Sequence, residues 1–553
     1  MFKRLLIGSA AALLFSGTTH AQLGQNLFIG NAKALALGNA VTADPPGIDS
    51  IHFNPAGLVK LKGTKQHLKF IMGTADISAE FIAGENTGIF YSLDGEPVRE
   101  RTYAELQADA GSIDPTANST SEIENFAVYL PGMGVTPIPV IAAPLGGLSF
   151  NPPGSDVTFA SAAYAPLILG YTRADDDPGV FYGRELGLAR ITYLSPTIGW
   201  QISDTFAFGA GIGISYMGVG LNLDYRAANI LIGALSDVVG DVCEGETSPI
   251  REIIDICGEG KSLSPFERVF TFEVELEEAF STTFNFGLLW EPTPWFSWGL
   301  VYQSEAADTL TGDLRVELNP ELINLLGGIV GPDQGIANLG LQLLLPGVNQ
   351  ELFIDNGRIK RTGRIDITLP QHIATGISVR VFPDLKVNLD YKWTETSKWE
   401  VLDFRFDSPI DTLGVLGAIG IEGVSGDGLT VPRKYQDASN WALGIEYQYN
   451  DQIALRFGYE PRDSGIPDDK RDFLIPLGDF DLWGLGLEYR MSPDQVFDFA
   501  VGFGKIDEYV RPGESTNGND VRTDNFVYNP SAGQDVSYTT EFLLFEVSWL
   551  STF

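Results

Sequence analysis

Residues 441–459 read WALGIEYQYNDQIALRFGY, and large apolar side chains alternate with small or polar ones along both halves of this stretch. A period of two predicts β-strands whose two faces differ, because successive side chains of a strand point to opposite sides. Asn450-Asp451, between the halves, is typical of a tight turn. The stretch therefore predicts a β-hairpin with one aromatic face and one small or polar face.

The same alternation recurs from about Thr64 to the end of the chain and gives about fourteen candidate strands. They lie near 65–81, 124–148, 156–171, 185–203, 205–225, 266–291, 294–318, 359–383, 384–407, 433–450, 451–463, 480–492, 493–507 and 536–553. Alternation alone leaves two architectures open, because a soluble sandwich and a lipid-facing barrel give the same local pattern.

The connections between strands favour the barrel. Tight turns such as Pro383-Asp384 and Ser492-Pro493-Asp494 alternate with long segments near 225–265, 319–358, 408–432, 461–479 and 508–535. Short turns on one side and long loops on the other are the pattern of bacterial outer-membrane barrels, whose strand number is even. We therefore predict an all-β chain: a transmembrane antiparallel β-barrel of about 14 strands over residues 64–553, in the outer membrane of a Gram-negative bacterium.

The two ends of the chain agree with this prediction. Residues 1–21 have a basic start, an apolar stretch and a small-residue cleavage site, so we expect a signal peptide. At the other end Phe545, Val547, Trp549 and Phe553 share one face of the last strand. This strand is similar to the signal that the barrel-assembly machinery recognises.

The composition limits the classes of partner that the chain can bind. The chain carries 72 acidic and 36 basic residues, a net charge of −36, which disfavours nucleic acid. In an exported protein Cys243 and Cys257 are expected to form a disulfide on an external loop rather than a metal site. We expect no metal and no cofactor.

Residues 22–63 do not alternate and are rich in Gly and Ala. A compact segment before the first strand of such a barrel is expected to lie in the lumen as a plug. Several motifs in and after it resemble the FadL/TodX family, outer-membrane transporters of long-chain fatty acids and aromatic hydrocarbons. They are Gly38-Asn39-Ala40, Asp44, Asn54-Pro55-Ala56, Leu369-Pro370, Lys434-Tyr435-Gln436-Asp437-Ala438 and Ile466-Pro467-Asp468-Asp469.

The resemblance implies a hatch over residues 22–63, an external groove that captures ligand, an internal pocket, and a sideways exit through a gap at an inward kink of the third strand. Here that strand would span 156–172, and the kink residues would be Ala165 and Pro166. Proline has no N–H for the strand ladder, so Pro166 is expected where pairing is already interrupted. A bulge without consequence is the alternative.

The resemblance assigns the external groove to the loops at 225–265 and 319–358. The candidate ligand-binding residues there are Ile230, Leu231, Leu235, Leu325, Leu326, Leu343 and Leu344. External loops this apolar are a liability unless they pack together or bind a ligand. Packing of the loops on one another is the alternative interpretation.

Family members that take fatty acids place basic side chains near the carboxylate. The candidates here are Arg433 and Lys434, which can equally be read as charges on the rim. The fifth-strand position that the resemblance assigns to an arginine falls near Met217-Gly218, where the sequence has no basic residue. Uncharged hydrocarbons therefore remain open as cargo.

We expect a monomeric channel for hydrophobic small molecules that contacts outer-membrane lipid and lipopolysaccharide and has no catalytic residues. A nonspecific porin is one alternative, and the plug argues against it. An outer-membrane enzyme of the lipase or protease type is the other. After the signal peptide the histidines are His52, His67 and His372, and their spacing shows no nucleophile–base pair.

Overall fold

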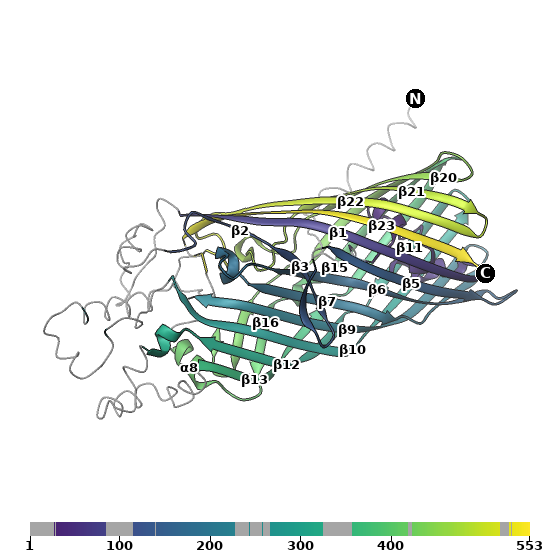
Figure 1. Ribbon diagram of the computed structural model, residues 1–553. Helices are drawn as coiled ribbons and strands as arrows, with labels where there is room; N and C mark the ends of the chain where they lie inside the picture. The colour runs from purple at the N-terminus through teal and green to yellow at the C-terminus, as the bar shows by residue number, and fades with distance from the viewer. Residues whose placement is uncertain are drawn as a thin grey trace.

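A computed structural model describes residues 27, 29–83, 114–138, 140–226, 243, 257, 266–324, 357–418, 423–519, 530–531 and 533–553. Its wall is a closed antiparallel barrel of 14 strands, as the sequence predicted (Figure 1). The barrel closes where the first strand pairs with the last, from Lys65 opposite Thr552 to Ala83 opposite Gln534.

Several wall strands are interrupted and carry two labels. In chain order the wall is formed by β1 (Gly63–Ala83), β2 with β5 (Ser119–Glu122, Ile141–Asn151), β6 (Val157–Thr172), β7 with β8 (Glu185–Leu194, Thr197–Ser203), β9 (Phe206–Arg226), β10 (Arg268–Thr293), β11 with β12 (Phe296–Gln303, Ala306–Leu318), β13 with β14 (Arg358–Leu369, His372–Phe382), β15 with β16 (Leu385–Thr394, Val401–Phe406), β18 with β19 (Gly428–Pro432, Ala438–Gln448), β20 (Ile453–Arg462), β21 (Phe480–Ser492), β22 (Gln495–Val510) and β23 (Gln534–Thr552).

Shorter elements complete the described chain. They are the 3-10 helices η3 (Pro178–Phe181), η6 (Thr396–Lys398) and η7 (Asp468–Lys470), the helix α8 (Asp411–Ala418), and the strands β3 (Asn125–Leu130), β4 (Gly134–Ile138) and β17 (Val424–Ser425). Within the described ranges, no helix combines the length and the apolar character needed to cross a membrane.

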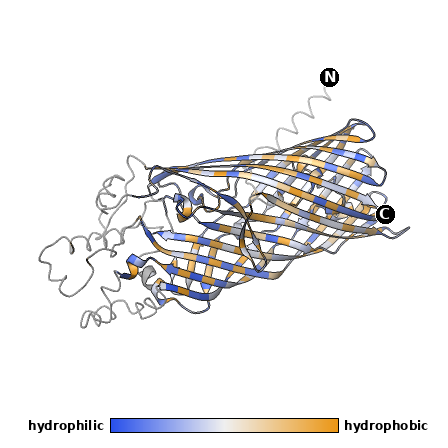
Figure 2. Ribbon diagram, viewed as in Figure 1, coloured by the Kyte–Doolittle hydropathy of each residue, from blue (hydrophilic) through white to orange (hydrophobic). Residues whose placement is uncertain are grey.

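The wall has two zones, which the long strand β10 shows most clearly. Towards the end with short turns, Phe284, Phe286 and Trp290 face outward and are exposed. A register shift between Glu278 and Ser281 marks the boundary. Beyond it outward-facing glutamates alternate with buried side chains such as Phe272, and Figure 2 shows this alternation along the wall strands. The aromatic zone suits hydrocarbon, and the acidic zone suits water above it.

The second wall strand differs from the sequence-based expectation of one strand over 124–148, which was wrong. β2 pairs with the outer end of β1, β5 pairs with the other end, and the chain between them leaves the ladder as the hairpin β3–β4. This hairpin packs on outward-facing positions of β7 and β9, and Figure 1 shows it crossing the outside of the wall. The turn at Pro131-Gly132-Met133-Gly134 gives the physical reason, because it breaks the apolar run.

The N-terminal segment lies inside the barrel, at the end with short turns, where Figure 1 shows it in purple. It contains α2 (Ala32–Ala36), η1 (Gly47–Asp49), α3 (Ser50–Phe53) and η2 (Pro55–Lys60). Its apolar side chains are buried against inward-facing residues of the wall such as Ala162 and Tyr164. We call residues 29–62 the hatch.

Candidate functional site

Asn54 joins the hatch to itself and to the wall. Its side-chain amide donates to the carbonyl of Thr42 at 2.8 Å and to the carbonyl of Leu288 in β10 at 3.0 Å. Its side-chain oxygen accepts from the backbone N–H of Ala56 at 3.2 Å and so caps η2, in which Pro55 is the first residue. The motif Asn54-Pro55-Ala56 is therefore a structural joint whose donors and acceptor are all used.

Gly38-Asn39-Ala40 lets the hatch approach the wall closely. Gly38 has φ +59°, and a Cβ atom there would lie 2.7 Å from the backbone nitrogen of Tyr459 in β20. Asn39 also has a positive φ, which asparagine tolerates. Its side-chain amide donates to Glu460 at 3.0 Å. The inward-facing Gly458 of β20 serves the same approach, since a Cβ there would lie 1.9 Å from the Gly38 nitrogen.

Asp49 is the centre of one buried ionic cluster. Its carboxylate lies 2.7 Å from the Lys69 ammonium and 3.2 Å from the His67 ring, both on β1. The Asn31 side chain donates to it at 2.7 Å. Burial opposes ionisation, but Lys69 and His67 more than offset it and hold the pKa of Asp49 below its ordinary value. The buried carboxyl of Glu546 in β23 interacts with the same cluster.

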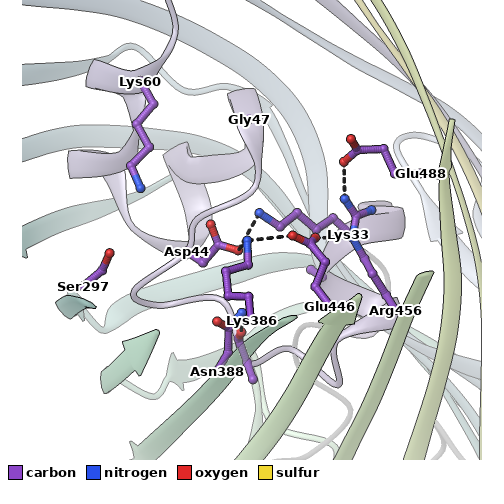
Figure 3. Close-up of polar contacts among 12 residues, drawn as sticks. Lys33, Asp44, Gly47, Lys60, Ser297, Lys386, Asn388, Glu446, Arg456 and Glu488 are labelled. Atoms are coloured by element: carbon purple, nitrogen blue, oxygen red, sulfur yellow. Dashed lines mark hydrogen bonds and ion pairs between the residues drawn. The ribbon is translucent and has the colours of Figure 1, made fainter. Parts of the chain in front are cut away.

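Asp44 is the centre of a second cluster (Figure 3). Its carboxylate lies 2.9 Å from Lys33 of the hatch and 2.6 Å from Lys386 of β15. Lys386 also pairs with Glu446 of β19 at 2.8 Å, and Glu446 pairs with Arg456 of β20 at 2.7 Å. Burial opposes ionisation of Asp44, yet the two lysines keep its pKa well below the ordinary value. Alternating charges thus tie the hatch to three wall strands.

The interruption of the second wall strand leaves an opening in the wall. β1 pairs with β5 up to Gly73 and is bonded again at Ile77, whose carbonyl accepts from the Ile123 N–H at 2.9 Å. Among the described residues, nothing pairs with residues 74–76 on that side. Within the described ranges, β6 also pairs with no strand on its facing edge between Ala163 and Tyr171.

A small apolar cavity of about 80 Å³ occupies this opening. It is bordered by Ala75 and Ile77 of β1, Phe126 of β3 and Ile168 of β6, and by Leu27 just before the hatch. Inward side chains from β21, β22 and β23 close its inner side, namely Phe480, Ile506, Thr540, Phe542 and Leu544. We call it the wall passage.

Pro166 does not line this passage; it lines a separate cavity with Arg190, and its bulge lies on the β7 edge of β6, not on the edge that faces the opening. The pairing of β6 with β7 shifts register between Tyr164 and Leu167, so Pro166 falls in a bulge. The ladder therefore needs no N–H donor at this position. On the same edge Ser195 replaces ladder bonds, since its hydroxyl accepts from the Ala162 N–H at 2.9 Å and donates to the Ala162 carbonyl at 2.7 Å. Ala165 is buried.

The outer half of the barrel has an apolar interior. Inward side chains from the wall form one large cluster, which we call the outer core; it includes Leu188, Val219, Phe272, Leu314 and Phe404. The described part of the loop after β12 joins it through Leu322 and Ile323. Cys243 and Cys257 form a disulfide that packs against the same cluster.

One guanidinium lies at the edge of the outer core. Arg190 of β7 is 2% exposed, and its Nη1 lies 3.5 Å from a carboxylate oxygen of Asp308. Among the described residues, its Nη2 has no hydrogen-bond partner. Arg190 stands directly across the ladder from Met217, the position that lacks a basic residue in the sequence. The sequence analysis did not identify Arg190, because the sequence of neither strand determines the register in which β7 and β9 pair.

The predicted pair Arg433 and Lys434 is divided by the structure. The backbone N–H groups of both residues donate to the Glu400 carbonyl at 2.8 Å. Arg433 is fully buried and paired with Asp472, whereas Lys434 is exposed and has a positive φ. Burial opposes ionisation of Arg433, but Asp472 raises its pKa above the ordinary value.

The seven loop residues proposed for the external groove, Ile230, Leu231, Leu235, Leu325, Leu326, Leu343 and Leu344, lie outside the described residues. Within the described ranges, no group of three or more His, Cys, Asp and Glu side chains is arranged to hold a metal ion.

The chain is similar to several known proteins. It matches the family model for "Outer membrane protein transport protein (OMPP1/FadL/TodX)" over residues 18–527. A long-chain fatty acid transport protein of Escherichia coli O6:H1 is 28% identical over 223 residues, 40% of this chain and 41% of that protein. The chain thus spans less than half of that relative in the match.

Solved structures share the fold at low identity. A FadL homologue of Pseudomonas aeruginosa has a TM-score of 0.62 and 15% identity, with 97% of this chain and 100% of that chain covered. The toluene transporter TodX of Pseudomonas putida has a TM-score of 0.55 and 14% identity, with 96% and 99% covered.

A closed barrel with an aromatic outer belt, filled at one end by its own N-terminal hatch, is an outer-membrane transport protein in architecture. Because the family model covers most of its length, the chain belongs to the OMPP1/FadL/TodX family of outer-membrane transport proteins.

Proposed function

We propose that this protein takes hydrophobic small molecules from the cell exterior into the outer membrane, including molecules that carry a carboxylate. The observation that carries the proposal is the order of compartments along the barrel axis. The outer half has an apolar interior, the other half is filled by the hatch, and the wall passage opens between them. A solute that enters the outer half finds the axial route blocked by the hatch and an apolar route through the wall.

Polarity favours this route for apolar cargo. The hatch–wall boundary is lined by ionic clusters, where an apolar solute would displace satisfied hydrogen bonds at a cost. The wall passage is lined almost entirely by apolar atoms, and Thr74 at its edge stands where the outward residues of β1 change from Met72 to Asp76. A molecule that leaves there meets the hydrocarbon boundary. The names of the similar proteins, a long-chain fatty acid transport protein and a toluene transporter, support cargo of this class.

Arg190 supports the inclusion of acids. A buried guanidinium with a free N–H group and one carboxylate at 3.5 Å is only partly compensated. A ligand carboxylate would complete its hydrogen bonds, and charge-assisted bonds of this kind are among the stronger ones in proteins. The tail of such a ligand would lie in the outer core, where Leu188 precedes Arg190 on the inward face of β7.

The test is uptake of radiolabelled oleate and toluene by a Gram-negative strain that lacks its own transporters of this family. We expect cells that express the chain to accumulate at least one of the two above cells with an empty vector. Accumulation of neither would contradict the proposal. Large conductance in planar bilayers without ligand would instead support a nonspecific porin.

A further inference from the structure

The hairpin β3–β4 is an addition to the wall rather than a part of it. Ile123 stands opposite Ile77 and Ile141 opposite Gly73, so residues 124–140 replace the three residues that a continuous strand would need opposite 74–76. The extra chain folds back on the outer surface of the barrel. Its first strand lines the wall passage through Phe126.

The hairpin packs on glycines of the wall strands β7 and β9, which we call the glycine floor. The Tyr129 ring covers Gly218 of β9, where a Cβ atom would lie 2.1 Å from the ring. Val135 covers Gly187 of β7, where a Cβ atom would lie 3.0 Å from a methyl group of Val135. These glycines face outward above the aromatic belt. A side chain on Gly218 would collide with the Tyr129 ring, whereas one on Gly187 would need Val135 to move only slightly.

Few polar bonds hold the hairpin down. At its tip the Gly132 N–H donates to Glu277 of β10 at 3.4 Å, a long bond. At its base Asn125 and Phe126 pair with β6, and the Glu124 N–H donates to the Thr172 carbonyl at 2.9 Å. By contrast, β1 pairs with β23 along nearly its whole length. The hairpin is therefore less restrained than β1, on the other side of the passage.

The wall passage is too small for the proposed cargo as it stands. An engineered apolar cavity of about 150 Å³ holds one benzene molecule, and the passage has about 80 Å³. Passage of a ring or an acyl chain therefore requires one side to move. Moving β1 would break the long ladder that it shares with β23, whereas lifting the hairpin breaks side-chain packing, one long bond at its tip and the short pairing with β6 at its base.

We propose that the hairpin β3–β4 is a flap that must lift from β7 and β9 for hydrophobic cargo to leave through the wall passage. The flap carries Phe126, which borders the passage, and rests on the glycine floor through Tyr129 and Val135. Its release sets the rate of exit and favours cargo narrow enough to pass beneath it. This inference rests on the proposed function.

A removable crosslink tests the flap. In the double variant V135C/G187C a disulfide would fasten the hairpin to β7, and the substitution of Val135 removes the methyl group that a Cβ at Gly187 would meet most closely. The matched control is D507C/T539C, a directly opposite pair on β22 and β23 that does not involve the hairpin. Uptake of labelled oleate and toluene is measured before and after reduction, with the parent chain under the same conditions.

We expect oxidised V135C/G187C to lose uptake and the reduced form to regain it, while the control pair and the parent transport in both states. Equal uptake by oxidised and reduced V135C/G187C would overturn the flap and leave the proposed function intact. Absence of uptake by the parent would overturn the proposed function, and the flap with it.

A second variant needs no crosslink. Tyr129→Ala removes the ring that covers Gly218, so the flap should lift more easily and initial uptake should be faster than in the parent. Tyr509→Ala makes the same change at an exposed position of β22 and should leave the rate unchanged. A Tyr129→Ala chain that folds and transports no faster than Tyr509→Ala would overturn the proposal.

Discussion

At the scale of single residues, the proposed uptake of acidic cargo depends on Arg190. Its guanidinium is buried, has one distant carboxylate and keeps a free N–H group. We expect Arg190→Met to weaken oleate uptake and to leave toluene uptake unchanged, because only oleate offers a carboxylate. A hydrogen bond to a charged group contributes about 1.5–3 kcal/mol, which corresponds to roughly a tenfold to hundredfold rise in the oleate concentration for half-maximal uptake.

The conservative variant is the control for this prediction. Arg190→Lys keeps the charge with fewer donors and should retain part of the oleate uptake. Equal loss of oleate and toluene uptake in Arg190→Met would show a structural role and contradict the assignment.

At this scale the sequence predicted motifs better than partners. Asn54-Pro55-Ala56 could be placed in the hatch because it lies in the segment that does not alternate and resembles a motif of the family. Arg190 could not be predicted as a ligand-binding residue, because its importance follows from its position opposite Met217. That pairing depends on the whole sheet. Arg433 was found from its type alone, and its partner Asp472 lies 39 positions away.

Among the elements, the hatch should respond to acid. Burial lowers the pKa of His52 from 6.5 to about 4, so its neutral form is favoured in the folded hatch. The unfolded hatch therefore binds more protons, and stability falls as the pH drops from about 6.5 towards 4. The pKa of Asp49 is also lowered, so the stability that its carboxylate contributes to the hatch is lost at lower pH, below the ordinary aspartate pKa of about 4. We expect conductance in planar bilayers to rise progressively below about pH 6.5.

Single substitutions separate the two groups. His52→Gln cannot be protonated, so the onset should move down to about pH 4, where Asp49 still acts. Asp49→Asn removes the part of the pH response that lies below about pH 4. This variant should show raised conductance even at pH 7, since Lys69 loses its carboxylate partner. Conductance of the parent that is constant from pH 7 to pH 4 would contradict the prediction.

The second wall strand marks the limit of prediction for elements. Residues 124–148 are rich in β-branched and aromatic residues, and that composition favours a strand wherever it lies. The turn at 131–134 breaks the strand, but nothing in the stretch itself says whether the resulting hairpin pairs within the wall or packs onto its outer face. The decision comes from distant residues, because Gly187 and Gly218 provide the floor that makes the outer position favourable.

Over the whole molecule the barrel was predictable for a simple physical reason. Each wall strand must present apolar atoms to lipid and different atoms to the lumen, so a period of two is repeated along the chain. The sequence of β10 also shows the division into two zones, because its outward residues change from glutamates to phenylalanines along the strand. The position of the wall passage could not be predicted in the same way, since it depends on six strands and on Leu27, just before the hatch, together.

The two zones lead to a prediction about stability. Phe286 is exposed on the aromatic belt, and an arginine there would be placed in hydrocarbon. Such a change costs about 2–4 kcal/mol near the bilayer midplane and roughly 0–1 kcal/mol at the interface. We therefore expect Phe286→Arg to lower the free energy of unfolding by about 2–4 kcal/mol in urea titrations of the protein in phospholipid vesicles.

Thr309 supplies the comparison, because it faces outward in the acidic zone and donates to Asp366 at 2.5 Å. Thr309→Arg would lose that hydrogen bond but place a cation beside the same carboxylate in water, where an exposed ion pair contributes at most about 1 kcal/mol. Its free energy of unfolding should therefore stay close to that of the parent. If both arginines destabilised the barrel equally, the hydrocarbon boundary would not lie at the register shift of β10, and the wall passage would not open at the membrane surface.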